Sequence, residues 1–381
     1  MKFQTDIRTG GNDCKRKSST KVSWLVLQSV RGAGKIYLKC RLEICSGNSN
    51  TPIMRVLVIG GAGYIGSHTA RALRRHGHDI IVYDNLSTGH KFLAEGFELL
   101  VGDIADVTTL RPVIDRVDAI VHFAAHAYVG ESVSNPRKYF RNNVEGALSL
   151  LNTAVDAGVR YFVFSSTCAV YGTPARVPIT EDFPRQPINP YGVSKLFFEN
   201  ALEAYDRAYG IRFAALRYFN AAGADESGEI GEVHDPETHL IPLALAATED
   251  DGSALQVYGT DYPTADGTCI RDYIHVNDLG EAHALALGKL VKGADSFAAN
   301  LGTGRGHSVL EIIKAVEEIS GKQVRWSAGL RRPGDPPALV ADPSRAVLLL
   351  QWRATRSLHD IVATAWRWKQ RSQARAEQGA D

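Results

Sequence analysis

The chain has 381 residues, enough for one large domain or two of moderate size. Hydrophobic residues make up 44% of it and charged residues 22%, which is ordinary for a globular protein with a real core. The net charge is +1, but residues 1–53 hold ten basic and three acidic side chains, so residues 54–381 carry a net charge of −6. An acidic body argues against nucleic acid as the main partner.

Cysteines and apolar runs exclude further classes. Three of the five cysteines lie in residues 1–53, and only Cys168 and Cys269 follow. An odd number at wide spacing forms neither a disulfide framework nor a zinc pattern, so we expect no metal and a reducing, cytoplasmic location. No apolar run approaches the roughly 20 residues that span a bilayer, so we expect no membrane partner. The short, interrupted apolar stretch at residues 22–30 is a poor secretory signal.

The first 53 residues differ from the rest of the chain. They show no clear period of 3.6 or 2, whereas a clean strand begins directly after Met54, the second of only two methionines. We interpret residues 1–53 as a basic leader that is disordered or lies upstream of the true start at Met54. A targeting segment is the alternative, although its acidic residues suit that role badly.

After the leader, strands and helices alternate, which is typical of a parallel sheet covered on both faces. The predicted strands are 55–59, 79–83, 97–101, 119–123, 161–164 and 212–216, and the predicted helices are 64–76, 136–156 and 190–209. We therefore expect an α/β fold, with a Rossmann-type doubly wound parallel sheet in residues 54–222. A smaller C-terminal α/β substrate-binding lobe is expected in residues 223–381, with some segments returning to the Rossmann domain.

A glycine-rich turn joins the first strand to the first helix. Gly60 permits the tight turn, Gly63 lets the backbone approach a pyrophosphate, and Gly66 lets the helix pack on the strand. The helix N-terminus then presents free N–H groups and a partial positive charge to phosphates. Asp84 ends the second strand, where a carboxylate accepts both ribose hydroxyls and repels a 2′-phosphate, so we predict NAD rather than NADP. Asp103, after the third strand, either accepts from an adenine amine or caps the following helix.

Tyr191 and Lys195 are four residues apart on the last predicted helix, so they project from one face. A free tyrosine has a pKa of roughly 10 and is a poor base at neutral pH. A nearby ammonium and the positive charge of oxidised nicotinamide stabilise the phenolate and lower that pKa. The hydroxyl of Thr167, which follows the fifth strand, can bond to the reacting oxygen or cap its own turn. We interpret these three residues as catalytic and Cys168 as a small buried hydrophobe.

Together these motifs resemble the extended short-chain dehydrogenase/reductase family and, within it, its UDP-glucose 4-epimerase group. The resemblance covers about residues 54–368. It rests on segments matched in order, namely GGAGYIGSH (60–68), YDNL (83–86), HFAA (122–125), VGESV (129–133), SSTCAVYG (165–172), NPYGVSK (189–195), LRYFNAAG (216–223), DYPT (261–264), GT (267–268), RDYIHV (271–276) and RRPGD (331–335).

The resemblance implies that Tyr191 removes the proton from the sugar O4 while C4 gives a hydride to NAD. The 4-ketose turns over in the site, and the hydride returns to the opposite face. The implied NAD-binding residues are Gly60, Gly63, Tyr64, Ile65, Gly66, Asp84, Asn85, Asp103, Ile104, Phe123, Ala124, Ala125, Asn142, Tyr191, Lys195 and Tyr218. The implied UDP-sugar-binding residues are Thr167, Tyr191, Asn220, Leu240, Tyr258, Arg271, Tyr273, Arg332 and Asp335. The family further implies a homodimer formed through a bundle of two helices from each subunit.

Two departures leave the substrate open. Ala127 stands where many relatives carry a lysine, and Leu339 stands where a tyrosine or a small residue sets the pocket volume. Alternatives to UDP-glucose/UDP-galactose are therefore UDP-arabinose/xylose, UDP-glucuronate and UDP-N-acetylhexosamine. A nucleotide-sugar 4,6-dehydratase needs an Asp-Glu pair after Thr167, where this chain has Cys168-Ala169. A non-catalytic NAD-binding regulator is a further alternative, but it has no need for the Tyr–Lys pair.

Overall fold

The computed structural model describes residues 25–27, 36–38, 52–250, 252–332 and 335–377, and the chain divides into two units, 1–51 and 52–381. In the first unit, β1 (Leu25–Leu27) and β2 (Ile36–Leu38) pair in antiparallel register. The sequence predicted no regular element there, because three apolar residues are too few to show a period. Residues 1–24, 28–35 and 39–51 lie outside the described residues, so the predicted disorder of the leader stays a prediction.

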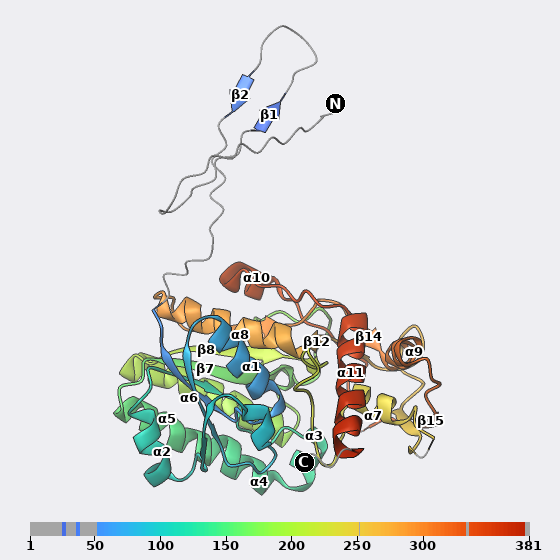
Figure 1. The fold of residues 1–381 in the computed structure, drawn as a ribbon, viewed down its shortest axis with the longest axis horizontal. Helices are drawn as coiled ribbons and strands as arrows, with labels where there is room; N and C mark the ends of the chain where they lie inside the picture. Colours follow the sequence, from blue (N-terminus) through green and yellow to red (C-terminus); the bar gives the residue numbers. More distant parts are fainter. Residues whose placement is uncertain (1–24, 28–35, 39–51, 251, 333–334, 378–381) are drawn as a thin grey trace. The chain divides into compact units, whose positions relative to one another are not determined.

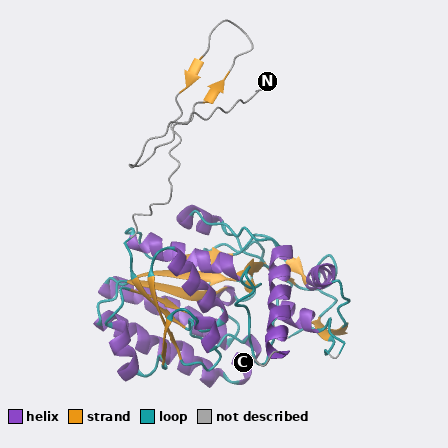
Figure 2. Cartoon of the chain, viewed as in Figure 1, coloured by secondary structure: helices purple, strands orange, loops and turns teal. Residues whose placement is uncertain are grey.

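A seven-stranded parallel sheet forms the centre of the second unit, which confirms the predicted Rossmann-type fold (Figure 2). Its order is β13-β8-β7-β6-β3-β4-β5. The strands are β3 (Arg55–Ile59), β4 (Asp79–Asp84), β5 (Glu98–Val101), β6 (Ala119–His122), β7 (Tyr161–Thr167), β8 (Arg212–Tyr218) and β13 (Phe297–Leu301). The order reverses between β3 and β6, and open sheets of this kind bind ligands in the crevice beyond the carboxyl ends of such strands.

Helices cover both faces of this sheet (Figure 1). Val56 and Val58 of β3 pack into one core with α1 (Tyr64–Arg75), α8 (Val276–Val291) and α10 (Ser344–Leu350). Leu57 and Ile59 pack into the other with α2 (Val107–Ile114), α5 (Ala147–Asp156) and α6 (Pro190–Tyr209). Successive side chains of a strand point to opposite faces, so one apolar strand serves two cores.

The helix predicted for residues 136–156 is interrupted. After α3 (Val129–Ser134), the structure has α4 (Pro136–Phe140), a π-helical turn η2 (Arg141–Gly146) and then α5. A π turn contains one residue more than an α-helical turn, and the spacing of apolar residues in the sequence does not reveal it. Such turns are frequent at functional sites. The turn holds Asn142 and Asn143, and the Asn143 side chain contacts the loop after β6 by accepting from the His126 N–H.

The chain beyond Gly223 is more regular than the sequence suggested. Helix α8 and strand β13 return to the Rossmann sheet. Buried polar residues such as Asn277, Asp278 and His283 interrupt the apolar period of α8, which explains why it was missed. The predicted boundary at residue 222 stays a prediction.

A third core gathers the remaining elements of this part of the chain. Its helices are α7 (Leu240–Ala246), α9 (Val309–Ser320) and α11 (Leu358–Glu377). The short strands pair as β9 (Asn220–Ala222) with β12 (Tyr273–His275), β10 (Leu255–Tyr258) with β15 (Trp326–Gly329), and β11 (Ile270–Arg271) with both β14 (His307–Ser308) and β16 (Ala338–Leu339). Two 3₁₀ turns, η1 (Lys91–Ala94) and η3 (Cys168–Tyr171), complete the elements. Within the described ranges, no helix is both long and apolar enough to cross a membrane.

Candidate active site

The glycine turn between β3 and α1 has the backbone that a dinucleotide requires. Gly60 has a φ of +76°, and a Cβ placed there would lie 2.6 Å from the backbone nitrogen of Ala124 on the next strand's loop. A Cβ on Gly66 would clash with the carbonyl oxygen of Gly60. A Cβ on Gly63, the N-cap of α1, would meet only that same carbonyl, at 3.3 Å. The space over Gly63 is therefore open for a pyrophosphate to approach the helix N-terminus.

Asp84 closes the turn from the end of β4. Its Oδ2 accepts from the Ala62 N–H at 2.9 Å and its Oδ1 from the Leu86 N–H at 2.8 Å. Burial raises the pKa of this carboxyl, and the two backbone N–H groups oppose that rise. A carboxylate has about four lone-pair positions, so both oxygens keep capacity for ribose hydroxyls. These residues fit NAD.

Asp103 does not cap the helix that follows it. The cap of α2 is Asp106, which accepts from the N–H groups of Thr108 and Thr109. Asp103 instead accepts from the Ala105 N–H at 2.9 Å and from the Asn85 amide at 2.8 Å. An exposed carboxylate held this way beside the turn remains available to an adenine amine. Ile104, the next residue, is buried.

Tyr64, at the start of α1, was also predicted to bind NAD. Its hydroxyl donates to the Gly223 carbonyl at 2.6 Å, so only its backbone can face a phosphate.

Sequence reasoning missed Asn143. Its amide donates to the carbonyl of His126 at 2.9 Å and to the hydroxyl of Ser194 at 3.1 Å, and its oxygen accepts from the His126 N–H. It thereby ties the loop that carries Phe123, Ala124 and Ala125 to the catalytic helix. Asn142, which was predicted to contact NAD, donates to the Asn143 oxygen at 2.9 Å. The π turn therefore directs Asn143, and not Asn142, towards the loop after β6 and α6.

The first turn of α6 places the Tyr–Lys pair beside β7. The Asn189 side chain caps the helix by accepting from the Gly192 N–H at 2.9 Å, and Pro190 fits the first helical position. A Cβ on Gly192 would lie 2.6 Å from the Ala169 carbonyl oxygen, so the helix approaches the end of β7 only because this residue is glycine. Gly210, with a φ of +74°, ends the helix, in agreement with the predicted bound at residue 209.

Lys195 is buried and donates from Nζ to the Ser165 carbonyl at 2.8 Å. Its Nζ lies 6.0 Å from the centre of the Tyr191 ring. Burial lowers the pKa of Lys195 to about 7, against the opposing effect of Glu199. Glu199 only partly offsets the effect of burial, and perturbed pKa values of this kind are typical of functional sites.

Tyr191 differs from the sequence expectation in one respect. In the protein alone, its pKa is raised, by burial first and by Tyr218 next, whereas the Thr167 hydroxyl lowers it. The expected acidity of the phenol therefore does not come from protein charges alone. Thr167 also accepts from the Ala169 N–H at 3.1 Å, so its hydroxyl both caps its own turn and lies beside the phenol. The Tyr218 hydroxyl lies 2.5 Å from Ser165 Oγ on the neighbouring strand.

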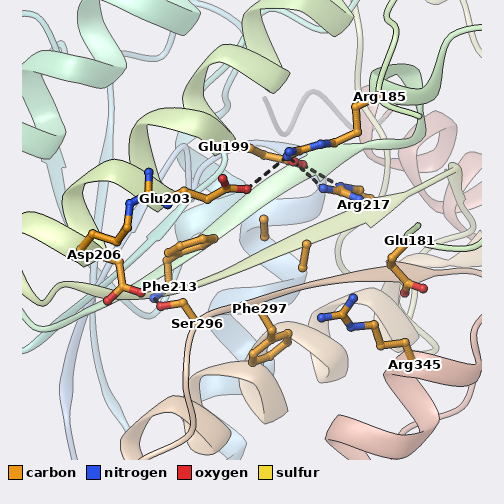
Figure 3. A pocket seen from close by; sticks show the side chains of 13 residues that line it. Glu181, Arg185, Glu199, Glu203, Asp206, Phe213, Arg217, Ser296, Phe297 and Arg345 are labelled. Carbon is orange, nitrogen blue, oxygen red and sulfur yellow. Dashed lines mark hydrogen bonds and ion pairs between the residues drawn. The ribbon is translucent and has the colours of Figure 1, made fainter. Parts of the chain in front are cut away.

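A charged cavity of about 400 Å³ lies farther along α6 (Figure 3). Glu199 lies between Arg217, at 2.6 Å, and Arg185, at 3.3 Å. The lining contains four carboxylates and four guanidinium groups but none of the three predicted catalytic residues. Because its charges are balanced and the Tyr–Lys pair lies elsewhere, we do not assign this cavity as the active site.

Four predicted substrate residues come together as two pairs. Arg271 forms an ion pair with Asp335 and donates to the Pro336 carbonyl at 2.9 Å. The Arg332 guanidinium lies 4.1 Å from the centre of the Tyr258 ring. These pairs bring two cations, an aromatic face and a carboxylate into one lobe.

The other predicted substrate residues are placed by backbone pairing. Asn220 and Tyr273 are register partners in β9 and β12, and Leu240 is the first residue of α7. Leu339 is half-buried and pairs with Arg271 in the register of β16 and β11. Ala127, in the loop after β6, is exposed.

The parallel sheet, the glycine turn and the Tyr–Lys pair define a doubly wound, NAD-binding protein. Residues 56–302 match the NAD dependent epimerase/dehydratase family, and the chain belongs to that family. The UDP-glucose 4-epimerase of Lactobacillus helveticus is 47% identical over 319 residues, which cover 83% of this chain and 97% of that protein. That of Rhizobium meliloti (strain 1021) is 48% identical with the same coverage.

Solved structures agree. The crystal structure of UDP-glucose 4-epimerase from Brucella ovis in complex with NAD shares 50% identity and a TM-score of 0.80, covering 82% of this chain and 97% of that one. The family resemblance, the fold and the cofactor predicted from the sequence are thereby confirmed.

Proposed function

We propose that this chain catalyses the NAD-dependent epimerisation of UDP-glucose and UDP-galactose at C4. The observation that carries the proposal is the position of Tyr191 and Lys195 beside Thr167 at the carboxyl edge of the sheet. The relatives with which the chain shares 47–48% identity over 83% of its length are UDP-glucose 4-epimerases.

The residues of this chain divide the work at the sugar. Tyr191 removes the proton from O4 and later returns it, while the Thr167 hydroxyl holds that oxygen. When bound, oxidised NAD supplies reversible hydride transfer at C4 and a positive charge beside the phenol. The Lys195 ammonium adds to that charge and favours the phenolate, which burial alone disfavours.

The C-terminal lobe holds the nucleotide in this proposal. Arg271 and Arg332 supply charge-assisted hydrogen bonds to the diphosphate, and Asp335 accepts from ribose hydroxyls. The Tyr258 ring, 40% exposed, offers its face to the uracil. The Arg271–Asp335 ion pair keeps both groups oriented before the substrate arrives.

A UDP-pentose is the second candidate substrate. A UDP-glucose 4-epimerase from Stenotrophomonas maltophila, 40% identical with a TM-score of 0.81, has been solved with bound NAD and formylated UDP-arabinopyranose. Leu339 is of intermediate size, so the sequence does not decide between hexose, pentose and N-acetylated sugar. The test is to incubate the purified protein separately with UDP-galactose, UDP-arabinose, UDP-galacturonate and UDP-N-acetylgalactosamine without added coenzyme. C4 inversion of UDP-galactose is expected, and its absence with every sugar would contradict the proposal.

A homodimer and a cytoplasmic location belong to the same proposal. Val193 and Phe197, four residues apart on α6, are 40% and 46% exposed, and such an apolar stripe suits a helix bundle between two subunits. Cys168 and Cys269 are free thiols, as a reducing compartment requires. Light scattering should give a dimer mass, and Phe197→Glu should reduce it to a monomer mass. A monomer for the unaltered chain would contradict this proposal.

A further inference from the structure

Four side chains outside the active site converge in the segment before α7. Glu232, His234, Glu237 and His239 each contribute one nitrogen or oxygen atom, and all four atoms lie within 4.8 Å of one another. The expectation of no metal rested on cysteine spacing, which carries no information on this set. The four residues span only eight positions, so a single loop assembles the cluster.

The spacing of the atoms suits a tetrahedral cation. The Oε1 atom of Glu232 lies 2.6 Å from Nδ1 of His239 and 3.1 Å from Nδ1 of His234. Glu237 oxygens lie 3.3 Å from the His239 nitrogen and 3.7 Å from the His234 nitrogen. Zinc bonds of about 2.0–2.1 Å at a tetrahedral angle separate ligand atoms by about 3.3 Å. The measured distances bracket that value.

The burial of the Glu232 carboxylate gives a second indication. Its side chain is 6% exposed, and Oε1 points between the two imidazoles. Oε1 forms ion pairs with both imidazoles, but among the described residues neither this oxygen nor Nδ1 of His234 makes a hydrogen bond of good geometry. A cation between them would satisfy both atoms at once.

Surrounding groups orient the ligands. Oε1 of Glu237 accepts from the backbone N–H groups of Thr238 and His239, at 2.7 and 2.8 Å. The Trp368 indole donates to the Glu232 carbonyl at 3.0 Å and so holds this residue against α11. Such outer contacts are a regular part of metal sites.

We propose that Glu232, His234, Glu237 and His239 bind one Zn²⁺ ion as a structural site. Imidazole nitrogen and carboxylate oxygen are both zinc ligands, and four protein ligands leave no open position for a reacting water. This site goes beyond the proposed function and does not depend on it.

The position of the cluster indicates what the ion would stabilise. The His234 ring lies edge-on to Tyr64, at the start of α1, and to Tyr128, in the loop after β6, with centroid distances of 6.3 and 6.0 Å. Leu240 directly follows the last ligand and begins α7. An ion here would hold this segment against the side of the Rossmann domain that carries the glycine turn.

The test measures metal on the full-length, NAD-bound chain after its affinity tag has been removed. After passage over a chelating resin that strips loose metal, mass spectrometry should find about one zinc per chain. His239→Ala should lower the affinity for zinc by at least about tenfold. Because the His239 side chain is 45% exposed, this variant should still fold. His359→Ala, at an exposed histidine outside the cluster, is the matched control and should retain the ion.

A second readout uses Zn²⁺ alone as the probe. After removal of metal by a chelator, added Zn²⁺ should raise the melting temperature of the unaltered chain and of His359→Ala, but not of His239→Ala. The proposal is overturned if the unaltered chain neither retains zinc nor responds to it, or if His239→Ala binds zinc equally well. The four residues would then form only an ion-pair cluster. Neither readout uses turnover, so failure here is distinct from failure of the proposed function.

Discussion

Helix α6 contributes to two polar regions that differ in how their charges are compensated. At the sheet's carboxyl edge, Lys195 is buried against the Phe164 ring and a backbone carbonyl, and its pKa is lowered to about 7. One turn later, Glu199 contacts Arg217 with both oxygens, at 2.9 and 2.6 Å, and the pKa of Arg217 is raised by this partner. Burial therefore destabilises the charged form of Lys195, whereas Glu199 is paired with Arg217 through both of its oxygens.

The two regions follow one another along α6 on the same face of the sheet. Phe164, beside Lys195, and Ser166, beside Glu199, both point to that face from β7. On the next strand Arg217 meets Glu199 there, whereas the Ser165 and Tyr218 hydroxyls meet on the opposite face. A compensated buried charge stabilises the fold, and an uncompensated one is available for chemistry. A perturbed pKa, as at Lys195, therefore marks the active site better than the number of charged side chains does. The Glu199–Arg217 region has more charged side chains and lines the cavity, but its charges are paired.

The largest expected effect concerns catalysis at the first region. Tyr191→Phe removes the group that exchanges the O4 proton, so turnover of UDP-galactose should fall by about 10²–10⁴-fold. NAD content and melting temperature should stay close to those of the unaltered chain, because the ring and its packing remain. If turnover and NAD binding both survive intact, the assignment of the first region as catalytic is wrong.

Changes at the Glu199–Arg217 pair should lower the stability of the fold. Arg217→Met leaves Glu199 buried without its bidentate partner, and the free energy of unfolding should fall by about 3–5 kcal/mol in urea titrations. Glu203→Gln, at the exposed end of the same cavity, is the control and should change it by less than about 1 kcal/mol. Equal losses in the two variants would show that the buried pair is not the stabilising element.

The pH dependence of stability separates the two regions further. The pKa of Lys195 is about 7 in the folded chain and 10.5 in a free lysine, so the unfolded chain binds more protons between these values. Stability should therefore rise with pH in this window, by up to about 1.4 kcal/mol per unit, and should level off below pH 7. Lys195→Met should abolish this contribution in urea titrations at several pH values, whereas Arg217→Met should leave its slope in place.

The smallest effect should appear in substrate affinity. Arg332→Ala removes the cation stacked on Tyr258 and should raise KM for the UDP-sugar by about tenfold, or ~1.4 kcal/mol, with kcat little changed. Arg331→Ala is the matched control, because that guanidinium pairs with Asp261 at 2.7 Å. A rise in KM as large for Arg331→Ala as for Arg332→Ala would contradict the assignment of Arg332 to the diphosphate.

Much of the catalytic edge could be predicted because its signals are local. The turn at Gly60–Gly66 and the i, i+4 pair on α6 depend on spacing alone, and the boundaries 190–209 agree with the structure. Asn143 could not be predicted, because its role depends on a π turn that periodicity does not reveal. The predicted acidity of Tyr191 stays a prediction, because it includes the charge of bound nicotinamide; in the protein alone burial raises the pKa, and a sequence does not report burial depth.

The sequence by itself determined six of the seven strands of the central sheet, the phosphate turn and the identity of the Tyr–Lys pair, because each follows from residues that are near neighbours along the chain. Only the tertiary structure decided which charges are compensated. It joined Glu199 to Arg217, Arg271 to Asp335, and the Glu232 segment to α11, across separations of 18 to 136 residues. Compensation depends on distances between side chains from different elements, and those distances exist only once the sheet and its helices have packed.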